Sequence, residues 1–294
     1  MRFRLIDAAK EDFPVQRLCK VLDVSPSGYF AWRRRPASPR QREDLVLLAQ
    51  IRSSFALSRE TYGSPRMTRE LQEEGFNGGR RRTARLMREN GLNARPKRRF
   101  KRTTDSHHAF PIAPNLIDQD FSAERPNHKW AADISYVWTA EGWLYLAVVL
   151  DLFARRVVGW AVSERLHKEL ALEALGKALA VRRPGKGLIH HSDRGSQYGS
   201  LAYQAALRGH AIQISMSGKG NCYDNAVVET FFKTLKTELV WRTVFQSRAE
   251  AKDAIGRYID GFYNPVRRHS TLGFVSPVQF EKLTRQLLNR SPLN

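Results

Sequence analysis

The chain has 294 residues, a formal net charge of +20 at pH 7 and a hydrophobic content of 42%. This hydrophobic content excludes a globally disordered protein, and the basic charge makes nucleic acid the leading class of partner, ahead of an anionic membrane surface. No apolar run reaches the ~20 residues that a membrane-spanning helix needs, and two cysteines are too few for a disulfide framework or a cysteine-based zinc site. We therefore expect a cytoplasmic, nucleoid-associated protein with no membrane partner.

Two segments with the pattern of a helix-turn-helix come first along the chain. In the first, residues 14–22 form a short amphipathic helix, and Ser25 caps a second helix with Pro26 at its first position. In the second, a helix begins at residues 64–65, glycines interrupt it, and residues 80–90 form another helix. Turn glycines followed by an arginine-rich second helix are typical of recognition of a DNA major groove.

Basic charge is concentrated at the end of the second segment. Residues 80–102 contain eleven Lys or Arg and one acid, a net charge of +10. Surface helices normally interleave acids with bases, so this run favours a recognition helix and an extended basic arm over a merely solvated face. The predicted DNA contacts are Arg80, Arg81, Arg82, Arg85 and Arg88 on the helix and Arg95, Lys97, Arg98, Arg99, Lys101 and Arg102 in the arm.

From residue 125 the pattern changes to that of an α/β domain. Three β-rich runs at hairpin spacing are followed by alternating helices and short strands. This order is that of a ribonuclease-H-like domain, whose mixed five-stranded sheet is covered by helices on both faces. The predicted strands are 129–139, 143–152, 156–162, 187–191 and 211–215, and the predicted helices are 170–181, 201–208, 224–240 and 248–262.

These patterns divide the chain into all-α helix-turn-helix units followed by one catalytic core. The segment before the core, with Pro111 and Pro114, is expected to be a linker. The predicted boundaries are 1–40 for the first unit, 41–105 for the second with its arm, 106–124 for the linker, 125–285 for the core and 286–294 for a tail.

Three carboxylates on apolar elements form the candidate active site. Asp133 lies inside the first β-rich run and Asp193 follows a short strand, so the two meet at one edge of the sheet if their strands are neighbours. Glu229, with 35 residues between it and Asp193, flanks the apolar stripe of a helix and can lean over that edge. A carboxylate in a central strand is costly without a cation, and carboxylate oxygens are the ligands that Mg²⁺ and Mn²⁺ prefer.

Such a triad can hold two Mg²⁺ or Mn²⁺ ions about 4 Å apart, which serve the attacking and leaving oxygens of a phosphoryl transfer. Taken singly, each acid is more simply a strand-end salt bridge or a helix cap; taken together, in this order of elements, they favour a metal site. Lys233 and Lys236 follow Glu229 by four and seven positions, on the same side of the helix. Both are candidates for gripping a phosphate beside the metals.

Neighbouring acids have simpler predicted roles. Asp151 ends the second β-rich run, and we expect it to cap the hairpin turn and to pair with Arg155 or Arg156. Asp224 and Asn225 precede the helix of the third acid, and we expect them to act as its N-caps.

Two histidine pairs resemble metal ligands. Adjacent strand residues point to opposite faces, so at most one of His190 and His191 can join the site, and support of the strand is the favoured role. His107 and His108 have no cysteine nearby, which argues against a zinc knuckle.

With these motifs in view, the chain resembles the insertion-sequence-three family of bacterial transposases, in its catalytic frame of the OrfB type. The likeness covers almost the whole chain, and the Asp–Asp–35–Glu spacing with a lysine seven residues after the glutamate is highly specific. The segments that carry it are residues 13–15, 17–19, 25–32, 62–66, 85–87, 91–92, 130–136, 190–198, 221–236, 263–269 and 276–277.

The resemblance implies that Asp133, Asp193 and Glu229 are the catalytic acids of a retroviral-integrase-like domain, with Lys236 as an additional basic position. The implied chemistry is strand cleavage at a transposon end, followed by attack of the freed 3′-hydroxyl on DNA. The implied partners are double-stranded DNA (terminal inverted repeats and target), further copies of the chain in a homo-oligomer, and the helix-turn-helix protein of an upstream reading frame, separate or fused. Further candidate DNA contacts are Lys233, Arg267 and Arg268, the last two in a basic turn.

Two other functions stay open at this point. A ribonuclease-H-like nuclease would only hydrolyse DNA, and strand joining would separate it from a transposase. A DNA-binding regulator would carry the core as a relic, and the intact triad argues against that reading.

Overall fold

The computed structural model describes residues 2–94, 112–218 and 222–290. Three short helices come first: α1 (Arg2–Ala9), α2 (Val15–Val21) and α3 (Pro26–Arg34). Ser25 caps α3 as predicted, because its hydroxyl accepts a hydrogen bond from the backbone N–H of Gly28 at 3.0 Å. Helix α1 is not predicted from the sequence; its Ile6 shares a small core with Tyr29, whose hydroxyl donates to Asp7 at 2.9 Å.

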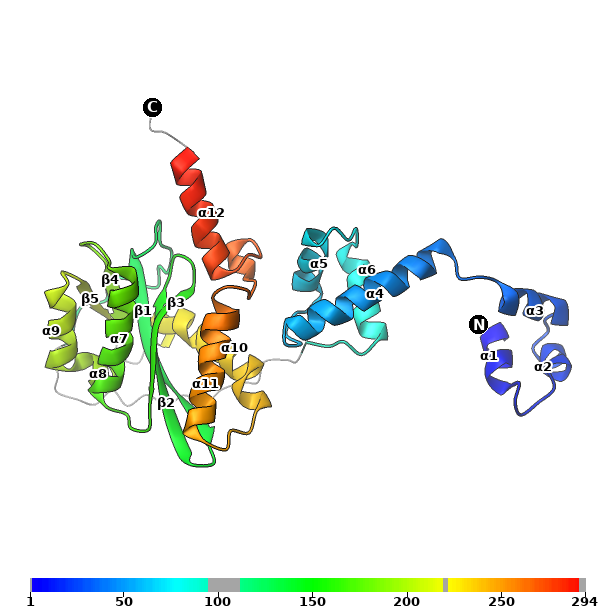
Figure 1. Ribbon diagram of the computed structural model, residues 1–294, viewed down its shortest axis with the longest axis horizontal. Coiled ribbons are helices and arrows are strands. Elements are labelled where there is room, and N and C mark those ends of the chain that lie inside the picture. The colour runs from blue at the N-terminus through cyan, green and yellow to red at the C-terminus, as the bar shows by residue number, and fades with distance from the viewer. Residues whose placement is uncertain (1, 95–111, 219–221, 291–294) are drawn as a thin grey trace.

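The next three helices, which we call the helical unit, are α4 (Pro39–Leu57), α5 (Ser64–Glu73) and α6 (Arg80–Glu89). The long helix α4 is also absent from the sequence prediction, although Ser38 and Gln41 form a capping box at its start. Figure 1 shows the helical unit between the sheet and the first three helices. The buried apolar side chains of its core are Leu47, Ile51, Phe55, Tyr62, Met67, Leu71, Leu86 and Met87.

The remainder of the chain is built on one five-stranded mixed sheet, as the sequence predicts. Its strands are β1 (Lys129–Thr139), β2 (Gly142–Asp151), β3 (Arg156–Ser163), β4 (Ile189–Ser192) and β5 (Gln213–Met216). The spatial order is β3-β2-β1-β4-β5, with β1 antiparallel to β2 and parallel to β4. Strand β1 is therefore central, with a hairpin partner on one side and a parallel crossover partner on the other.

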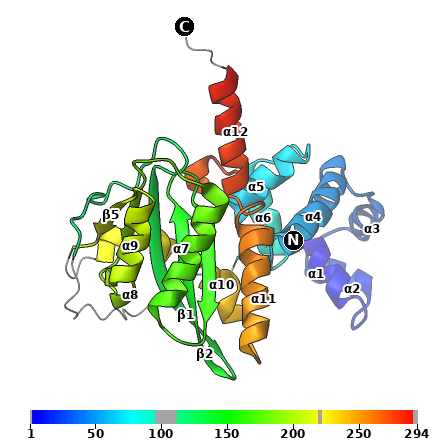
Figure 2. The same ribbon diagram turned by 60° about the vertical axis from the view of Figure 1, so that its left-hand side comes forward.

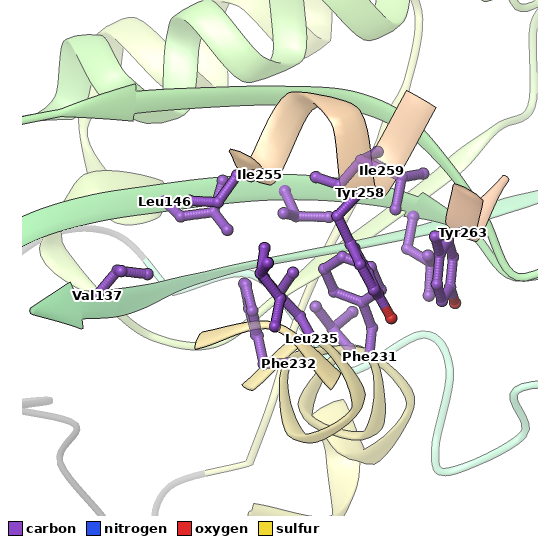
Figure 3. Packing of buried hydrophobic residues seen from close by; sticks show 14 of the residues in the cluster. Val137, Leu146, Phe231, Phe232, Leu235, Ile255, Tyr258, Ile259 and Tyr263 are labelled. Atoms are coloured by element: carbon purple, nitrogen blue, oxygen red, sulfur yellow. The ribbon is translucent and has the colours of Figure 1, made fainter. Parts of the chain in front are cut away.

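Helices cover both faces of the sheet, which confirms the predicted fold class (Figure 1 and Figure 2). On one face lie α7 (Lys168–Arg182), α8 (Ser196–Gly199) and α9 (Leu201–Gly209), and on the other α10 (Ala226–Glu238) and α11 (Arg248–Tyr258). Figure 3 shows Phe231, Phe232 and Leu235 of α10 packed in one cluster with Val137 and Leu146 of the sheet. Burial of each such side chain contributes roughly 1.5–3 kcal/mol, so this predicted apolar stripe holds α10 on the sheet.

Close packing of α7 on the sheet depends on a glycine in β3. A β-carbon at Gly159 would lie 2.2 Å from the carbonyl oxygen of Ala174 and 2.8 Å from the β-carbon of Ala178. Both alanines are buried. The alanine-rich sequence of α7 therefore provides a face of small side chains that lets the helix backbone approach the strand.

Residues 112–124, predicted as part of a linker, contain no helix or strand but pack against the sheet. The carbonyl of Pro114 accepts a hydrogen bond from the backbone N–H of Met216 at 3.2 Å. Ile117 is 3% exposed and belongs to the same core as α10. This segment therefore covers the outer edge of β5, where unpaired backbone groups would otherwise be open to another strand.

The C-terminal part differs most from the predicted elements. Helix α11 ends at Tyr258 and continues as a π-helical turn (Ile259–Tyr263), where the sequence predicts one helix to residue 262. The side chain of Asn264 then binds the backbone of Val157 in both directions, at 3.0 and 2.9 Å. Helix α12 (Pro277–Arg290) extends into the predicted tail. No helix among the described residues is long and apolar enough to cross a membrane.

Candidate active site

Asp133 lies on β1, and Asp193 directly follows the adjacent parallel strand β4, so the two are at the same level of the sheet. Strand β1 pairs with β4 so that Ala132 is opposite Ser192, and each aspartate is the next residue along the chain. The strands are thus neighbours, which is the condition on which the sequence prediction depends. Asp133 is half-buried, and its carboxylate accepts a hydrogen bond from the backbone N–H of Ile134 at 2.7 Å.

Glu229 lies in the first turn of α10, on the sheet face to which Asp133 points. Ala131 and Val137 share a core with the apolar stripe of α10, and because side chains alternate along a strand, Asp133 points to that same face. The Glu229 side chain is 39% exposed, and its carboxylate lies 3.8 Å from Nζ of Lys233. The structure therefore brings the third acid to the side of the sheet where the prediction needs it.

The three carboxylates act on one another electrostatically. Burial raises the pKa of Asp133 well above its ordinary value, and the nearby charges of Asp193 and Glu229 raise it further. Lys236 is 7% exposed; burial lowers its pKa to about 8, and attraction to Asp133 acts in the opposite direction. A half-buried group of like charges, with one ammonium beside it, is a place where added positive charge is favoured.

The donor set of this cluster suits a hard divalent cation. All three acids offer carboxylate oxygens, which Mg²⁺ and Mn²⁺ prefer, and a cation would relieve the repulsion between Asp133 and Asp193. Among the described residues, no three acidic, histidine or cysteine side chains are close enough to hold an ion, and Glu229 is turned toward Lys233. Asp193 and Glu229 nevertheless lie close enough to Asp133 for their charges to raise its pKa.

The residues that fasten the start of α10 are the ones the sequence assigns to capping. Asn225 occupies the N-cap position without a side-chain cap bond, and its Nδ2 donates to the carbonyl of Ala132 at 3.2 Å. The Asp224 carboxylate accepts from the backbone N–H of Gly218 at 2.7 Å and from Nδ2 of Asn115 at 3.1 Å. Asn225 therefore holds the predicted N-cap position without the expected cap bond, because its side chain ties α10 to β1, and the Asp224 side chain ties the start of α10 to the segment before the sheet.

The segment after β4 contains two residues near the aspartates that sequence reasoning missed, Gly195 and, in α8, Tyr198. The backbone N–H of Gly195 donates to Oδ1 of Asp193 at 2.9 Å, and a β-carbon at this glycine would lie 2.9 Å from the same oxygen. Tyr198 is 2% exposed; burial raises the pKa of its hydroxyl well above the ordinary value, and Tyr203, Asp133 and Asp193 add to the effect. A glycine two positions after an acid in a short loop was the available sequence signal.

Both histidines of β4 support the sheet, as predicted. Nε2 of His190 bonds to the Tyr203 hydroxyl at 3.0 Å. Nδ1 and Nε2 of His191 bond to the hydroxyls of Ser215 and Ser217 at 2.8 and 3.2 Å. Burial lowers the pKa of the first imidazole to about 3 and that of the second to about 4, so both are neutral at physiological pH.

Asp151 caps the hairpin turn as predicted, but its charge partner is a different arginine. Its Oδ1 accepts from the backbone N–H of Phe153 at 3.1 Å. Its Oδ2 binds NH2 of Arg182 at 2.6 Å. The prediction of Arg155 or Arg156 is wrong, because the end of α7 brings a distant arginine to the buried carboxylate.

The arginines of α6 fall into two groups. Arg82 and Arg85 each bind the Asp44 carboxylate of α4 at 2.6 Å, so part of their role is to hold the helical unit together. The other three are exposed to solvent: Arg80, Arg81 and Arg88.

Several predicted residues lie outside the part of the chain that the structure describes. They are Arg95, Lys97, Arg98, Arg99, Lys101 and Arg102 of the basic arm, with His107 and His108.

Both arginines of the C-terminal basic turn form ion pairs within the protein. Arg267 is 3% exposed and binds Glu238 with NH2 at 2.7 Å. Arg268 is 7% exposed and binds Glu70 and Glu73 at 2.5 and 2.6 Å. Because both guanidinium groups are buried in ion pairs, neither is exposed to a DNA phosphate.

Comparison with known proteins places this architecture in a family. Integrase core domain families match residues 123–222 and 210–277, and an HTH-like domain matches residues 41–100. The chain is 42% identical over 283 residues to the transposase InsF of insertion sequence IS3A from Escherichia coli, covering 96% of this chain and 98% of that one. The chain belongs to the IS3 family of insertion-sequence transposases. The resemblance seen in its motifs is thereby confirmed.

One further relative and one solved structure are similar to this IS3-family transposase. It is 46% identical over 270 residues to an uncharacterized 31 kDa protein of insertion element IS600 from Shigella sonnei, covering 92% of this chain and 99% of that one. Among solved structures, the catalytic core of HTLV-2 integrase in complex with magnesium is 16% identical, with a TM-score of 0.42 over 54% of this chain and 99% of that one.

Proposed function

We propose that this IS3-family transposase cleaves DNA at the ends of an insertion sequence and transfers the freed 3′-hydroxyl strand to DNA. The observation that carries the proposal is the placement of Asp133 on β1 and of Asp193 at the end of the adjacent parallel strand β4, with the helix of Glu229 on the face to which Asp133 points. These three acids would hold Mg²⁺ or Mn²⁺, two ions per site. When bound, such ions supply activation of the attacking oxygen and stabilisation of the leaving one.

The chain's own residues supply the electrostatics around that centre. The phosphoryl transition state is anionic, so a buried ammonium beside it is favourable. Lys236 provides that charge, since it is buried and close enough to Asp133 to feel its field. The exposed Lys233 would contact a DNA phosphate one turn away.

DNA is the partner that this arrangement supports. The exposed arginines of α6 would contact the terminal inverted repeat, and the acids would act on the bond at its end. We propose that the protein works as a homo-oligomer on end and target DNA, with the upstream-frame helix-turn-helix protein as a separate or fused partner. Its place of action would be the cytoplasm, at the nucleoid. The exposed arginines of α6 are Arg80, Arg81 and Arg88.

The test is incubation of the full chain with Mg²⁺ and a set of candidate transposon-end duplexes, with nicked and joined strands separated on a denaturing gel. We expect Asp133→Asn, Asp193→Asn and Glu229→Gln each to abolish both products, a loss of at least about a thousandfold by comparison with other single catalytic deletions. Binding of end DNA should stay within about twofold, because the acids hold metals and the helical unit holds phosphates. Activity near that of the wild type in any one variant would remove that residue from the site.

The same gel separates the rival functions. Nicked strands without joined strands, at every end duplex tried, would favour a nuclease that only hydrolyses. Binding without either product would favour a regulator. Replacement of Mg²⁺ by Ca²⁺ serves as the metal control, because looser calcium coordination misplaces the reacting oxygens.

A further inference from the structure

Two sequence motifs that take no part in the proposed chemistry meet in the structure. Residues 62–66 lead into α5, and residues 263–269 follow α11. Tyr62 is buried in the core of the helical unit, yet its hydroxyl reaches the catalytic domain. It accepts a hydrogen bond from the backbone N–H of Arg268 at 2.9 Å and donates one to the carbonyl of Val266 at 3.4 Å.

The side chain of Arg268 also binds α5, through two glutamates of that helix. Its guanidinium donates to Glu70 at 2.5 Å and to both carboxylate oxygens of Glu73 at 2.6 and 2.7 Å. A further bond to the carbonyl of Phe274, at 3.0 Å, holds the arginine from its own side. The side chain is 8% exposed, so these bonds are shielded on the arginine side, unlike surface ion pairs that contribute little.

A second contact lies beside the first. Arg242 donates to the carbonyl of Arg59 at 2.5 Å and to that of Glu60 at 3.4 Å. The guanidinium of Arg59 in turn lies over the rings of Tyr258 and Phe262, at 5.7 and 5.3 Å from their centres. With two separate contacts, the helical unit is held against rotation as well as against separation. Figure 2 shows α5 and α6 next to the chain that leads into α12.

The residues beneath this contact are connected to the candidate active site through helix α10. Arg267 binds Glu238 with Nε at 2.8 Å and NH2 at 2.7 Å, and the Tyr258 hydroxyl donates to the same carboxylate at 2.6 Å. Glu238 is the last residue of α10, the helix whose first turn carries Glu229. At a rise of 1.5 Å per residue, the two glutamates are roughly 14 Å apart along one rigid helix.

We propose that residues 263–268, with Glu238 and Tyr258, form a socket for the chain's own helical unit, and that Arg268 and Tyr62 are positioning residues for strand transfer. The inference rests on the proposed function. Recognition of the DNA end and cleavage belong to different units, so the bond that is cut depends on the geometry between them. When the helical unit is docked in the socket, DNA bound by α6 is held so that one of its phosphates lies at the three acids.

The experiment reverses the charge of the socket and then restores it. In the full chain we would compare the wild type, Arg268→Glu, Arg268→Glu with Glu73→Arg, and Arg268→Glu with Glu74→Arg. Glu74 is the matched control, because its carboxylate bonds to Gln50 and Ser54 and not to the socket. The readouts are circular dichroism, the maximum dimension in small-angle X-ray scattering, the affinity for end DNA, and the yield and position of cleaved strands.

We expect Arg268→Glu to fold, to enlarge the maximum dimension, and to bind end DNA within about twofold of the wild type. Joined product should fall by roughly tenfold or more, with cleavage spread over neighbouring phosphates. The Glu73→Arg partner should restore compactness and the single cleavage position, and the Glu74→Arg partner should restore neither. Unaltered dimensions and cleavage in Arg268→Glu, or equal rescue by both partners, would overturn the socket.

Tyr62→Phe keeps the buried ring and removes both hydroxyl bonds, so it decides the matter if Arg268→Glu does not fold. We expect a smaller increase in the maximum dimension and a smaller spread of cleavage positions than in Arg268→Glu. Wild-type cleavage with an unchanged dimension would contradict the proposal. Failure of the wild type to cut any duplex would count against the proposed function, whereas the socket would still be judged by the scattering of the four proteins.

Discussion

In the candidate active site, a lysine is buried near an aspartate. Lys236 is 7% exposed and lies on α10 two turns beyond Glu229, which keeps its ammonium near Asp133 while the helix stripe faces the sheet. Burial opposes the charge and lowers the pKa to about 8. The residue is therefore held where its charge is costly, as expected if the charge serves the reaction and not the fold.

We expect Lys236→Ala to slow strand transfer by about one to two orders of magnitude, because one buried charge near the transition state is lost. The affinity for end DNA should change little. Lys233→Ala is the control, since that lysine is exposed one turn earlier and pairs with Glu229 at 3.8 Å. Single-turnover joining assays measure the rate, and equal rates in the two alanine variants would contradict a special role for Lys236.

Two histidines that are buried and neutral make the stability of the fold depend on pH. Burial is the main cause that lowers the pKa of His190 to about 3 and that of His269 to about 2. An unfolded histidine titrates near 6.5. Below that pH the unfolded state binds more protons than the folded state, so the free energy of unfolding falls as the pH falls.

His190→Gln should therefore flatten this dependence, by up to about 2 kcal/mol between pH 6.5 and 5. Glutamine can still bond to Tyr203 but does not titrate in this range. Denaturant unfolding of wild type and variant at the two pH values measures the difference. The same loss of stability in both proteins would show that His190 is not the source.

At the scale of single elements, helix α6 separates arginines that hold the unit together from arginines that face solvent. We expect replacement of Arg80, Arg81 and Arg88 by alanine to flatten the logarithmic salt dependence of DNA binding by up to about 3, at roughly 0.9 per phosphate contact. Arg82→Ala should instead lower the thermal stability of the helical unit, because it breaks the 2.6 Å pair with Asp44.

Fluorescence anisotropy titrations of end DNA at several salt concentrations measure these slopes, with calorimetry for the stability. An unchanged slope in the triple variant would move the DNA surface away from α6. A large change in slope for Arg82→Ala would show that this arginine leaves Asp44 to meet a phosphate.

Elements with a strong local pattern were predictable, and those without one were not. Strand β1 and helix α10 are rich in apolar residues, so both elements were predictable from the sequence, and the three acids were assigned by their place on or beside such elements. Helix α4 was missed, because Leu45, Val46 and Leu57 are more than half exposed and blur its amphipathic period. The π-helical turn after α11 has no pattern that distinguishes it from a continuing helix.

At the scale of the whole molecule, partners far apart in the chain carry no local signal. From the sequence alone, Arg268 is a basic residue in a turn. In the structure it binds Glu73 of α5, which lies 195 positions away in the chain. Arg182 similarly reaches Asp151 from the end of α7. The composition correctly indicated the class of protein, a cationic DNA-binding protein. It could not distinguish arginines that neutralise buried acids from arginines that are available to bind DNA.

The contact between Tyr62 and Arg268, which joins residues 206 positions apart, has a consequence for how transposases of this kind diverge. A change in the socket alters which changes are tolerated in α5, so the two segments should be inherited as a matched pair. A recombinant that takes its first hundred residues from one lineage and the remainder from another would contain two halves that each fold and yet do not fit.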